Sequence, residues 1–143
     1  SIATANGFDA LKALLPPPPR RALVLIDPSY ETRDDYPHVI AALKDGLTRF
    51  ATGTYAIWYP QLARPEARQL PEKLKRLPVK NWLNVSLTVH TPSPDGIGMH
   101  GSGMFVINPP WTLHKTLAEI MPYLVQTLGQ DAGASFILEQ ETQ

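Results

Sequence analysis

Hydrophobic and polar residues alternate along the chain with two different periods, one typical of helices and one typical of strands. Apolar residues recur every three or four positions in three segments, which predict helices at 7–15, 36–50 and 111–128. Apolar or alternating runs bounded by Gly or Pro predict strands at 22–26, 54–59, 83–91, 104–108 and 135–139. Because strands and helices follow one another, we expect an α/β fold with a mostly parallel sheet flanked by helices.

Proline limits two of the remaining segments. Pro65, Pro71 and Pro78 follow one another closely, so we expect only a short helix here, at about Glu72 to Leu77. The run Pro16–Pro19 ends the first helix, and we interpret it as a stiff connector to the next strand. Alternatively, this run docks into an aromatic groove of a partner, which would make the chain a non-catalytic interaction module.

Composition narrows the class of protein. The chain has 143 residues, of which 43% are hydrophobic, enough for one core. Thirteen basic residues balance thirteen acidic ones, so charge alone indicates no nucleic acid, although basic residues between Arg64 and Lys80 could touch RNA phosphates or form a solvated helix face. Cysteine, long apolar runs and a secretory start are all absent, so we expect a cytoplasmic protein without a membrane partner. The four histidines share no ligand spacing, and we expect no metal.

The most informative stretch is the apolar run Ala22–Ile26, which ends abruptly at Asp27, Pro28, Ser29 and Tyr30. Open α/β sheets bind ligands beyond the carboxyl ends of their strands, so an acid at this position faces the ligand crevice. Taken singly, these residues also fit plain roles, with Asp27 capping the next turn and Tyr30 in the core. Their combination at the tip of an apolar strand favours a functional site.

The motif Asp27-Pro28-Ser29-Tyr30 is similar to the Asp/Asn-Pro-Pro-aromatic motif of S-adenosylmethionine-dependent amino methyltransferases. Together with Gly7-Phe8, Leu14–Pro18 and Gly101–Trp111, it resembles the catalytic portion of the ribosomal RNA large-subunit methyltransferase J family over nearly the whole chain. The resemblance implies a class I Rossmann-like fold, S-adenosylmethionine as cofactor, and a monomer that methylates the exocyclic N6 of one adenine in 23S ribosomal RNA. Ser29 stands where the motif has proline, which loosens the loop.

The resemblance also implies roles for the motif residues. The Asp27 carboxylate and the Pro28 carbonyl accept the amino hydrogens of the adenine and so position its nitrogen for methyl transfer. The Tyr30 ring stacks on the target base, which must be flipped out or already unpaired. Ser29 and Glu31 complete the expected contacts with the substrate.

Cofactor binding is expected at Asn6 and Gly7, together with Asp27, because the family pattern places the cofactor beside the turn that Asn6 and Gly7 form. Alternatively, Asn6-Gly7 only forms the turn into the first helix. The sequence has no strand followed by a glycine-rich loop and a helix to hold the rest of the cofactor. We therefore expect residues 1–143 to be the C-terminal part of one Rossmann-like methyltransferase domain whose N-terminal half is absent.

A second motif, Asn108-Pro109-Pro110-Trp111, fits the general pattern better than the first. As the catalytic motif it would direct the enzyme to a DNA adenine or a protein glutamine, since related families use the asparagine version for those substrates. The strand before it follows a glycine-rich bend late in the chain, where such domains carry an added strand pair. We therefore interpret the second motif as structural, with Trp111 at the start of a helix.

Overall fold

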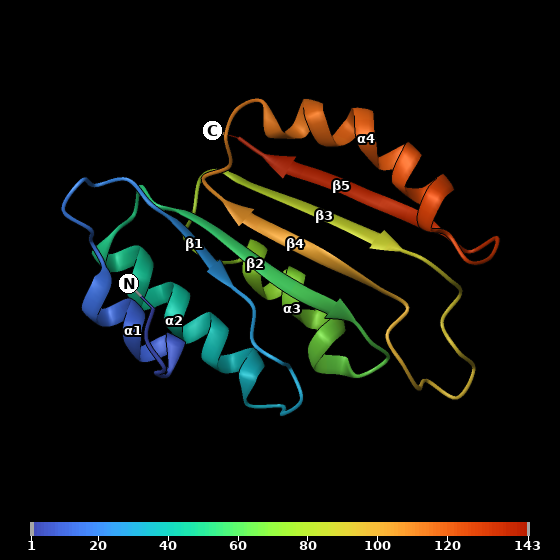
Figure 1. Ribbon diagram of the computed structural model, residues 1–143, viewed down its shortest axis with the longest axis horizontal. Helices are drawn as coiled ribbons and strands as arrows, with labels where there is room; N and C mark the ends of the chain where they lie inside the picture. The colour runs from blue at the N-terminus through green and yellow to red at the C-terminus, as the bar shows by residue number, and fades with distance from the viewer. Residues whose placement is uncertain (1, 143) are drawn as a thin grey trace.

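The computed structural model describes residues 2–142, which form four helices and one five-stranded sheet (Figure 1). The elements in chain order are α1 (Gly7–Leu14), β1 (Leu23–Ile26), α2 (Asp35–Arg49), β2 (Thr54–Gln61), α3 (Pro65–Lys75), β3 (Trp82–Thr88), β4 (Gly101–Ile107), α4 (Leu113–Leu128) and β5 (Ser135–Glu141). This order confirms the expected α/β class. It also places a helix or strand in each segment for which the hydrophobic pattern predicts one.

The sheet is mixed, with the strand order β1-β2-β4-β3-β5. Only β1 and β2 pair in parallel, whereas β4 is antiparallel to both β2 and β3, and β5 is antiparallel to β3. The expectation of a mostly parallel sheet is therefore wrong for the described strands. The cause is the position of β4, which inserts between β2 and β3. Strands β1, β2 and β3 still run in one direction, so their carboxyl ends share one edge of the sheet (Figure 1).

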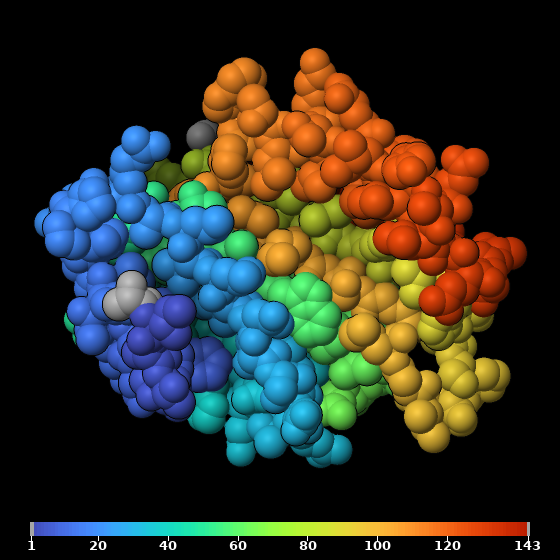
Figure 2. Space-filling view, in the orientation of Figure 1, coloured from blue at the N-terminus to red at the C-terminus, as the bar shows by residue number. Residues whose placement is uncertain are grey.

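The two faces of the sheet are covered unequally. Helices α1, α2 and α3 lie on one face, where the main core contains fully buried side chains of α2, α3, β2 and β4 such as Leu43, Leu70, Ile57 and Phe105. Helix α4 packs mainly on β3 and β5 on the other face, through a smaller cluster around Met121. Figure 2 shows this second face, with atoms of β1 (blue) at the surface beside α4 (orange).

Helix α3 begins earlier than expected and continues through a proline. Pro65 occupies the start of the helix, where no amide donor is needed, and Pro71 lies inside it. Ala67, Leu70 and Leu74 are buried on one face of α3, and their packing offsets the hydrogen bond that Pro71 cannot make. The expectation of a short helix at 72–77 is therefore wrong, because the regular spacing of buried apolar residues favours the longer helix despite its prolines.

Strand β2 likewise runs through Pro60 to Gln61 instead of ending at Tyr59. Its pairing with β1 stops at Ile57, so Pro60 has β4 as its only strand neighbour among the described residues. A strand with one free side tolerates a missing amide donor. The longer β2 carries the chain to the edge where β1 also ends.

The proline run Pro16–Pro19 connects α1 to β1, as expected of a connector. It contains a turn in which the Arg20 amide donates to the Pro17 carbonyl at 2.9 Å, and Leu15 before it is buried in the core. None of the helices in residues 2–142 is long and apolar enough to cross a bilayer.

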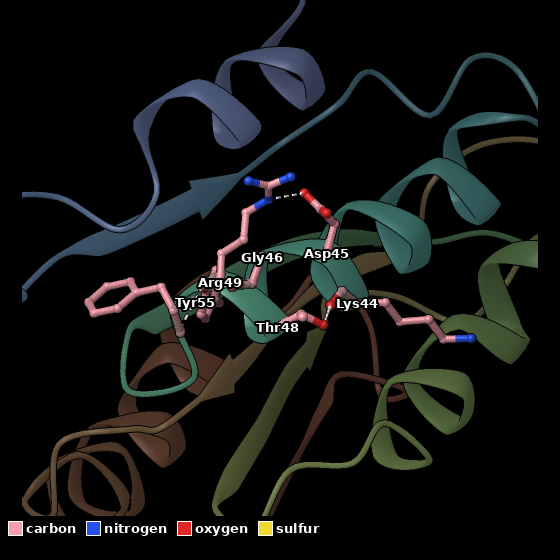
Figure 3. A network of polar contacts seen from close by, with 7 residues as sticks. Lys44, Asp45, Gly46, Thr48, Arg49 and Tyr55 are labelled. Carbon is pink, nitrogen blue, oxygen red and sulfur yellow. Dashed lines mark hydrogen bonds and ion pairs between the residues drawn. The ribbon is translucent and has the colours of Figure 1, made fainter.

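The junction between α2 and β2 is fixed by one buried hydroxyl. The Tyr55 side chain is fully buried, and its hydroxyl lies 2.9 Å from both the Gly46 and the Phe50 carbonyl oxygens at the end of α2 (Figure 3). The adjoining ion pair of Arg49 with Asp45 is solvent-exposed and follows the helix surface. The last turn of α2 and the first residues of β2 are thus tied together from inside.

We expect Tyr55→Phe to lower the free energy of unfolding by about 1–2 kcal/mol, because it removes the buried hydroxyl hydrogen bonding that ties the end of α2 to β2. Urea denaturation of the complete protein measures this loss. Tyr123→Phe is the matched control, since Tyr123 is 66% exposed on α4, and it should change the free energy by less than about 0.5 kcal/mol. Equal effects of the two substitutions would contradict the role given to the Tyr55 hydroxyl.

Candidate functional site

The loop after β1 places a carboxylate at the carboxyl edge of the sheet. Ile26 is buried and pairs with Ile57 of β2, which anchors the end of β1. Asp27 is exposed, Pro28 is half-buried, and the proline ring fixes the backbone at this point. The strand therefore delivers Asp27 to the position in which open α/β sheets meet their ligands.

A cavity of about 430 Å³ opens beside this loop. It lies between the start of α1 and the end of β1 and is lined by Asn6, Gly7, Phe8, Leu11, Leu25, Ile26, Asp27 and Pro28. The three residues expected at the cofactor, which are distant in the sequence, therefore share one cavity. Its walls are mainly apolar, with one amide and one carboxylate as polar groups, which is the usual composition of a small-molecule site.

Asn6 and Gly7 have a structural role and also border this cavity. The Asn6 side-chain oxygen accepts a hydrogen bond from the Phe8 amide at 2.9 Å and so caps α1. Its Nδ2 group makes no hydrogen bond among the described residues. A Cβ atom added at Gly7 would meet no atom within 4 Å, so a ligand can approach the backbone closely there.

The Tyr30 ring does not lie in this cavity, which corrects the expectation that it stacks on a base. Tyr30 is only 2% exposed, and its hydroxyl donates to the Trp58 carbonyl at 2.7 Å. Its ring centroid lies 4.8 Å from that of Tyr36. Burial raises the pKa of the Tyr30 hydroxyl, with smaller effects from neighbouring acidic groups. The ring is thus enclosed by the core, and no base can stack on it in this conformation.

The backbone of Tyr30 explains why its ring turns inward. Its φ angle is +54°, in the left-handed region that costs a residue with a side chain about 1–2 kcal/mol. Arg64 lies against the same point, with Nη1 at 3.3 Å from the Tyr30 carbonyl oxygen and at 3.4 Å from that of Glu31. The Arg64 guanidinium therefore contacts the loop itself. Ser29 and Glu31 have exposed side chains on the outside of the loop.

The second motif lies at the opposite edge of the sheet. Asn108 follows the end of β4, which runs against β2, and its Nδ2 donates to the Ala51 and Gly53 carbonyls at 2.8 Å each. The Thr54 hydroxyl donates to the Asn108 carbonyl at 3.0 Å. These contacts close the turn before β2. The geometry therefore gives Asn108 a structural role, while Trp111 is 93% exposed ahead of α4.

The structure contains a buried polar network that the sequence did not predict. Asn84 and Ser86 on β3 are polar, yet each is only 4% exposed. The Tyr59 hydroxyl donates to Asn84 Oδ1 at 2.7 Å, and Asn84 Nδ2 donates to Glu139 Oε2 at 3.2 Å. Lys75 Nζ lies 2.9 Å from the same Glu139 oxygen. Polar residues alternating with apolar ones on β3 were the available signal, but their partners come from β2, β5 and α3.

This network forms one side of a second cavity, of about 470 Å³, between α3 and the sheet. Burial raises the pKa of Tyr59 to about 12. The hydrogen bond from Lys75 lowers the pKa of Glu139 below its usual 4.5. Because its buried polar groups satisfy one another, the network fixes α3 against β3 and β5. Among residues 2–142, no three His, Cys, Asp or Glu side chains are placed to share a metal ion.

An exposed carboxylate at the carboxyl end of β1, open to a mainly apolar cavity, gives this α/β domain a candidate small-molecule site. The family model described as "Ribosomal RNA large subunit methyltransferase D, RlmJ" matches residues 1–138, and the chain belongs to this family.

Similar proteins agree with that assignment. The chain is 48% identical over 139 residues to the ribosomal RNA large subunit methyltransferase J of Haemophilus influenzae, and 43% identical over 123 residues to that of Escherichia coli. These alignments cover 97% and 86% of the chain but 49% and 44% of the relatives, so the chain spans about half their length. A crystal structure of a Legionella pneumophila protein matches with a TM-score of 0.85 and 31% identity, over 97% of this chain and 51% of that one.

We expect Glu139→Gln to destabilise the protein by about 0.5 kcal/mol at neutral pH, a small effect because solvent screens this partly exposed pair. The folded-state pKa of Glu139 is lowered, so its contribution is present above its usual pKa of 4.5 and is lost as the pH falls through the folded value. Thermal denaturation of both proteins from about pH 7 to about pH 3 should therefore show the difference shrinking below about pH 4.5.

The matched control for this pH series is Glu119→Gln, since Glu119 makes an exposed contact of 4.0 Å with Lys115. It should leave the stability unchanged within about 0.3 kcal/mol at every pH. A Glu139→Gln difference that stayed constant down to about pH 3 would contradict the ionised contact with Lys75.

Proposed function

We propose that this protein is an S-adenosylmethionine-dependent methyltransferase that methylates the exocyclic N6 of an adenine in 23S ribosomal RNA, with Asp27 as the catalytic carboxylate. Adenine 2030 is the target that the family resemblance implies. The observation that carries the proposal is the exposed Asp27 carboxylate at the tip of β1, in one cavity with Asn6 and Gly7. The names of the relatives support the class of reaction.

We further infer that residues 1–143 are the C-terminal part of one Rossmann-like methyltransferase domain. Two observations support this. On the face that α4 leaves open, Leu23 and Leu25 of β1 are 69% and 61% exposed, which is unusual for the apolar side of a strand. The curated relatives are about twice as long as the chain, so they contain further sequence that can cover this face. A ribosomal RNA substrate also agrees with the cytoplasmic location expected from the sequence.

The cavity beside Asp27 fits part of the proposed cofactor. Phe8, Leu11 and Leu25 supply apolar walls for a flat heteroaromatic ring, and the Asn6 amide supplies a donor for a ring nitrogen. The open space at Gly7 allows the ring to approach the backbone. When bound, S-adenosylmethionine supplies an electrophilic methyl group on its sulfonium.

In this proposal, the loop at Asp27 and Pro28 positions a weak nucleophile, the amino nitrogen of adenine. The amino nitrogen of adenine delocalises its lone pair into the ring, and two acceptors on its hydrogens favour the pyramidal form that can attack. The Asp27 carboxylate and the Pro28 carbonyl are adjacent acceptors at the rim of the cavity. Asp27 or solvent then takes the proton that leaves the methylated nitrogen.

The remaining contacts in the proposal concern the RNA. The target adenine must be flipped out of any helix or already unpaired to reach Asp27. Ser29 and Glu31 are exposed beside Asp27 and are the proposed contacts with the substrate strand. Tyr30 acts from inside the core, where it holds the loop, and the base needs another stacking partner.

We expect Asp27→Ala in the complete protein to reduce methylation of protein-free 23S ribosomal RNA by at least about 100-fold, because an acceptor on the nitrogen is lost, and Asp27→Asn, which keeps a carbonyl acceptor, to reduce it less. Incorporation of labelled methyl groups measures the rate. Asn108→Ala is the control from the second motif and should keep at least about half of the activity, despite a lower melting temperature. Activity that survived the Asp27 changes and vanished in Asn108→Ala would overturn the proposal.

We expect Asn6→Asp to weaken binding of S-adenosylhomocysteine by about 5- to 10-fold, the effect of one lost hydrogen-bond donor. The aspartate keeps the acceptor that caps α1, so the helix stays intact. Isothermal titration of the complete protein measures the affinity. The matched control is Asp9→Asn in the first turn of α1, which alters one charge outside the cavity and should leave the affinity unchanged. Equal affinities of wild type and Asn6→Asp would argue that Asn6 only caps the helix.

A further inference from the structure

We propose that Arg64 is a positioning residue for the proposed methyl transfer, because its guanidinium fastens the far end of the loop that carries Asp27 and Pro28. The inference rests on the proposed function and adds a residue to it. Arg64 contacts the Tyr30 and Glu31 carbonyls and does not line the cavity in which Asp27 lies. Its effect on the reaction is therefore transmitted through the loop backbone.

The loop from Asp27 to Glu31 is fastened at both ends. At the near end, Ile26 is buried and held by its pairing with β2. At the far end, the Tyr30 hydroxyl donates to the Trp58 carbonyl of β2, and Arg64 donates to the Tyr30 and Glu31 carbonyls. Between these two ends, the proline ring restricts the backbone. The orientation of the Pro28 carbonyl thus depends on how firmly the far end is held.

The far end is also where the loop is strained. Tyr30 has a φ angle of +54°, which a tyrosine adopts only when its surroundings compensate. Donation by Arg64 to the carbonyls of Tyr30 and of the next residue stabilises this backbone directly. Without it, the loop is free to relax toward an ordinary φ angle, and such a change would rotate the peptide groups that precede Tyr30.

Arg64 itself is held in place. It is half-buried at the start of α3, directly before Pro65, which fixes the backbone there. The hydroxyl of Tyr36 and one carboxylate oxygen of Glu66 are buried nearby and have no hydrogen-bond partner among the described residues. Burial raises the pKa of Tyr36, and the Arg64 charge opposes this rise, which agrees with their proximity. A cation beside these two groups is favoured, which helps to hold the Arg64 guanidinium at this point of the fold.

The guanidinium group suits this role better than an ammonium. Both contacts come from Nη1, whose two N–H groups are fixed in the guanidinium plane, so this one nitrogen can serve two successive carbonyls. Lysine has a compact head group that is more strongly hydrated, and we expect it to hold one carbonyl at a time. A graded series of Arg, Lys and Gln at position 64 therefore separates the fixed donor geometry of the guanidinium from its charge.

The test uses Arg64→Gln and Arg64→Lys in the complete protein, with steady-state methylation of protein-free 23S ribosomal RNA. We expect Arg64→Gln to lower kcat by about 10- to 100-fold while the KM values for RNA and S-adenosylmethionine change by less than about threefold. Arg64→Lys should lie between wild type and Arg64→Gln. Arg49→Gln is the matched control because it removes the same charge from an exposed pair with Asp45, and it should behave as wild type.

Amide hydrogen exchange supplies a readout that needs no activity. We expect the segment from Ser29 to Thr32 to exchange faster in Arg64→Gln and in Arg64→Lys than in Arg49→Gln, with the protection of β2 and β4 unchanged. If Arg64→Gln fails to fold, the comparison of Arg64→Lys with wild type decides. A reduced kcat together with faster exchange in this segment supports the proposal.

Two results would overturn it. The first is an unchanged kcat with unchanged exchange, which would make the contacts of Arg64 irrelevant to the loop. The second is an unchanged kcat with a raised KM for RNA and a shallower salt dependence, which would make Arg64 a phosphate contact. A wild-type protein without methyltransferase activity would overturn the proposed function instead, and the exchange experiment would still decide whether Arg64 holds the loop.

Discussion

The geometry of the site depends on the burial of one aromatic ring. Tyr30 follows the exposed Asp27 by three residues, yet its ring lies in the main core and its hydroxyl bonds to β2. An apolar ring with a satisfied hydroxyl is stable in such surroundings, and it draws the loop down onto the sheet. Asp27 stays at the surface because the chain turns inward immediately after it. The loop thus combines an accessible carboxylate with a backbone that cannot move far.

The two proline motifs show that position in the sheet decides what such residues do. The first follows β1, whose end lies at the edge where ligands bind, and Asp27 opens into a cavity there. The second follows β4, which runs the other way, so Asn108 reaches the opposite edge and uses its amide to close a turn. Similar residues are therefore suited to chemistry at one edge and to local structure at the other.

Much of the fold and the site could be predicted from local patterns. The spacing of apolar residues and the turn residues predicted the elements, and the acid at the end of an apolar strand pointed to the cavity that Asp27 lines. The sequence could not reveal that β4 inserts between β2 and β3, because strand order depends on contacts between distant residues. For the same reason the sequence left the inward ring of Tyr30 as an alternative and gave no sign of the contact from Arg64, since both depend on tertiary packing.

The outer side of β1 has a consequence for handling the protein. In the described part of the chain β1 has one strand neighbour, so the peptide groups on its other side lack a strand partner, and Leu23 and Leu25 project from it in the open. An exposed apolar strand of this kind is a template for pairing with other molecules. Residues 1–143 prepared by themselves would therefore tend to aggregate through β1, and covering this edge strand would help to keep the sample monodisperse.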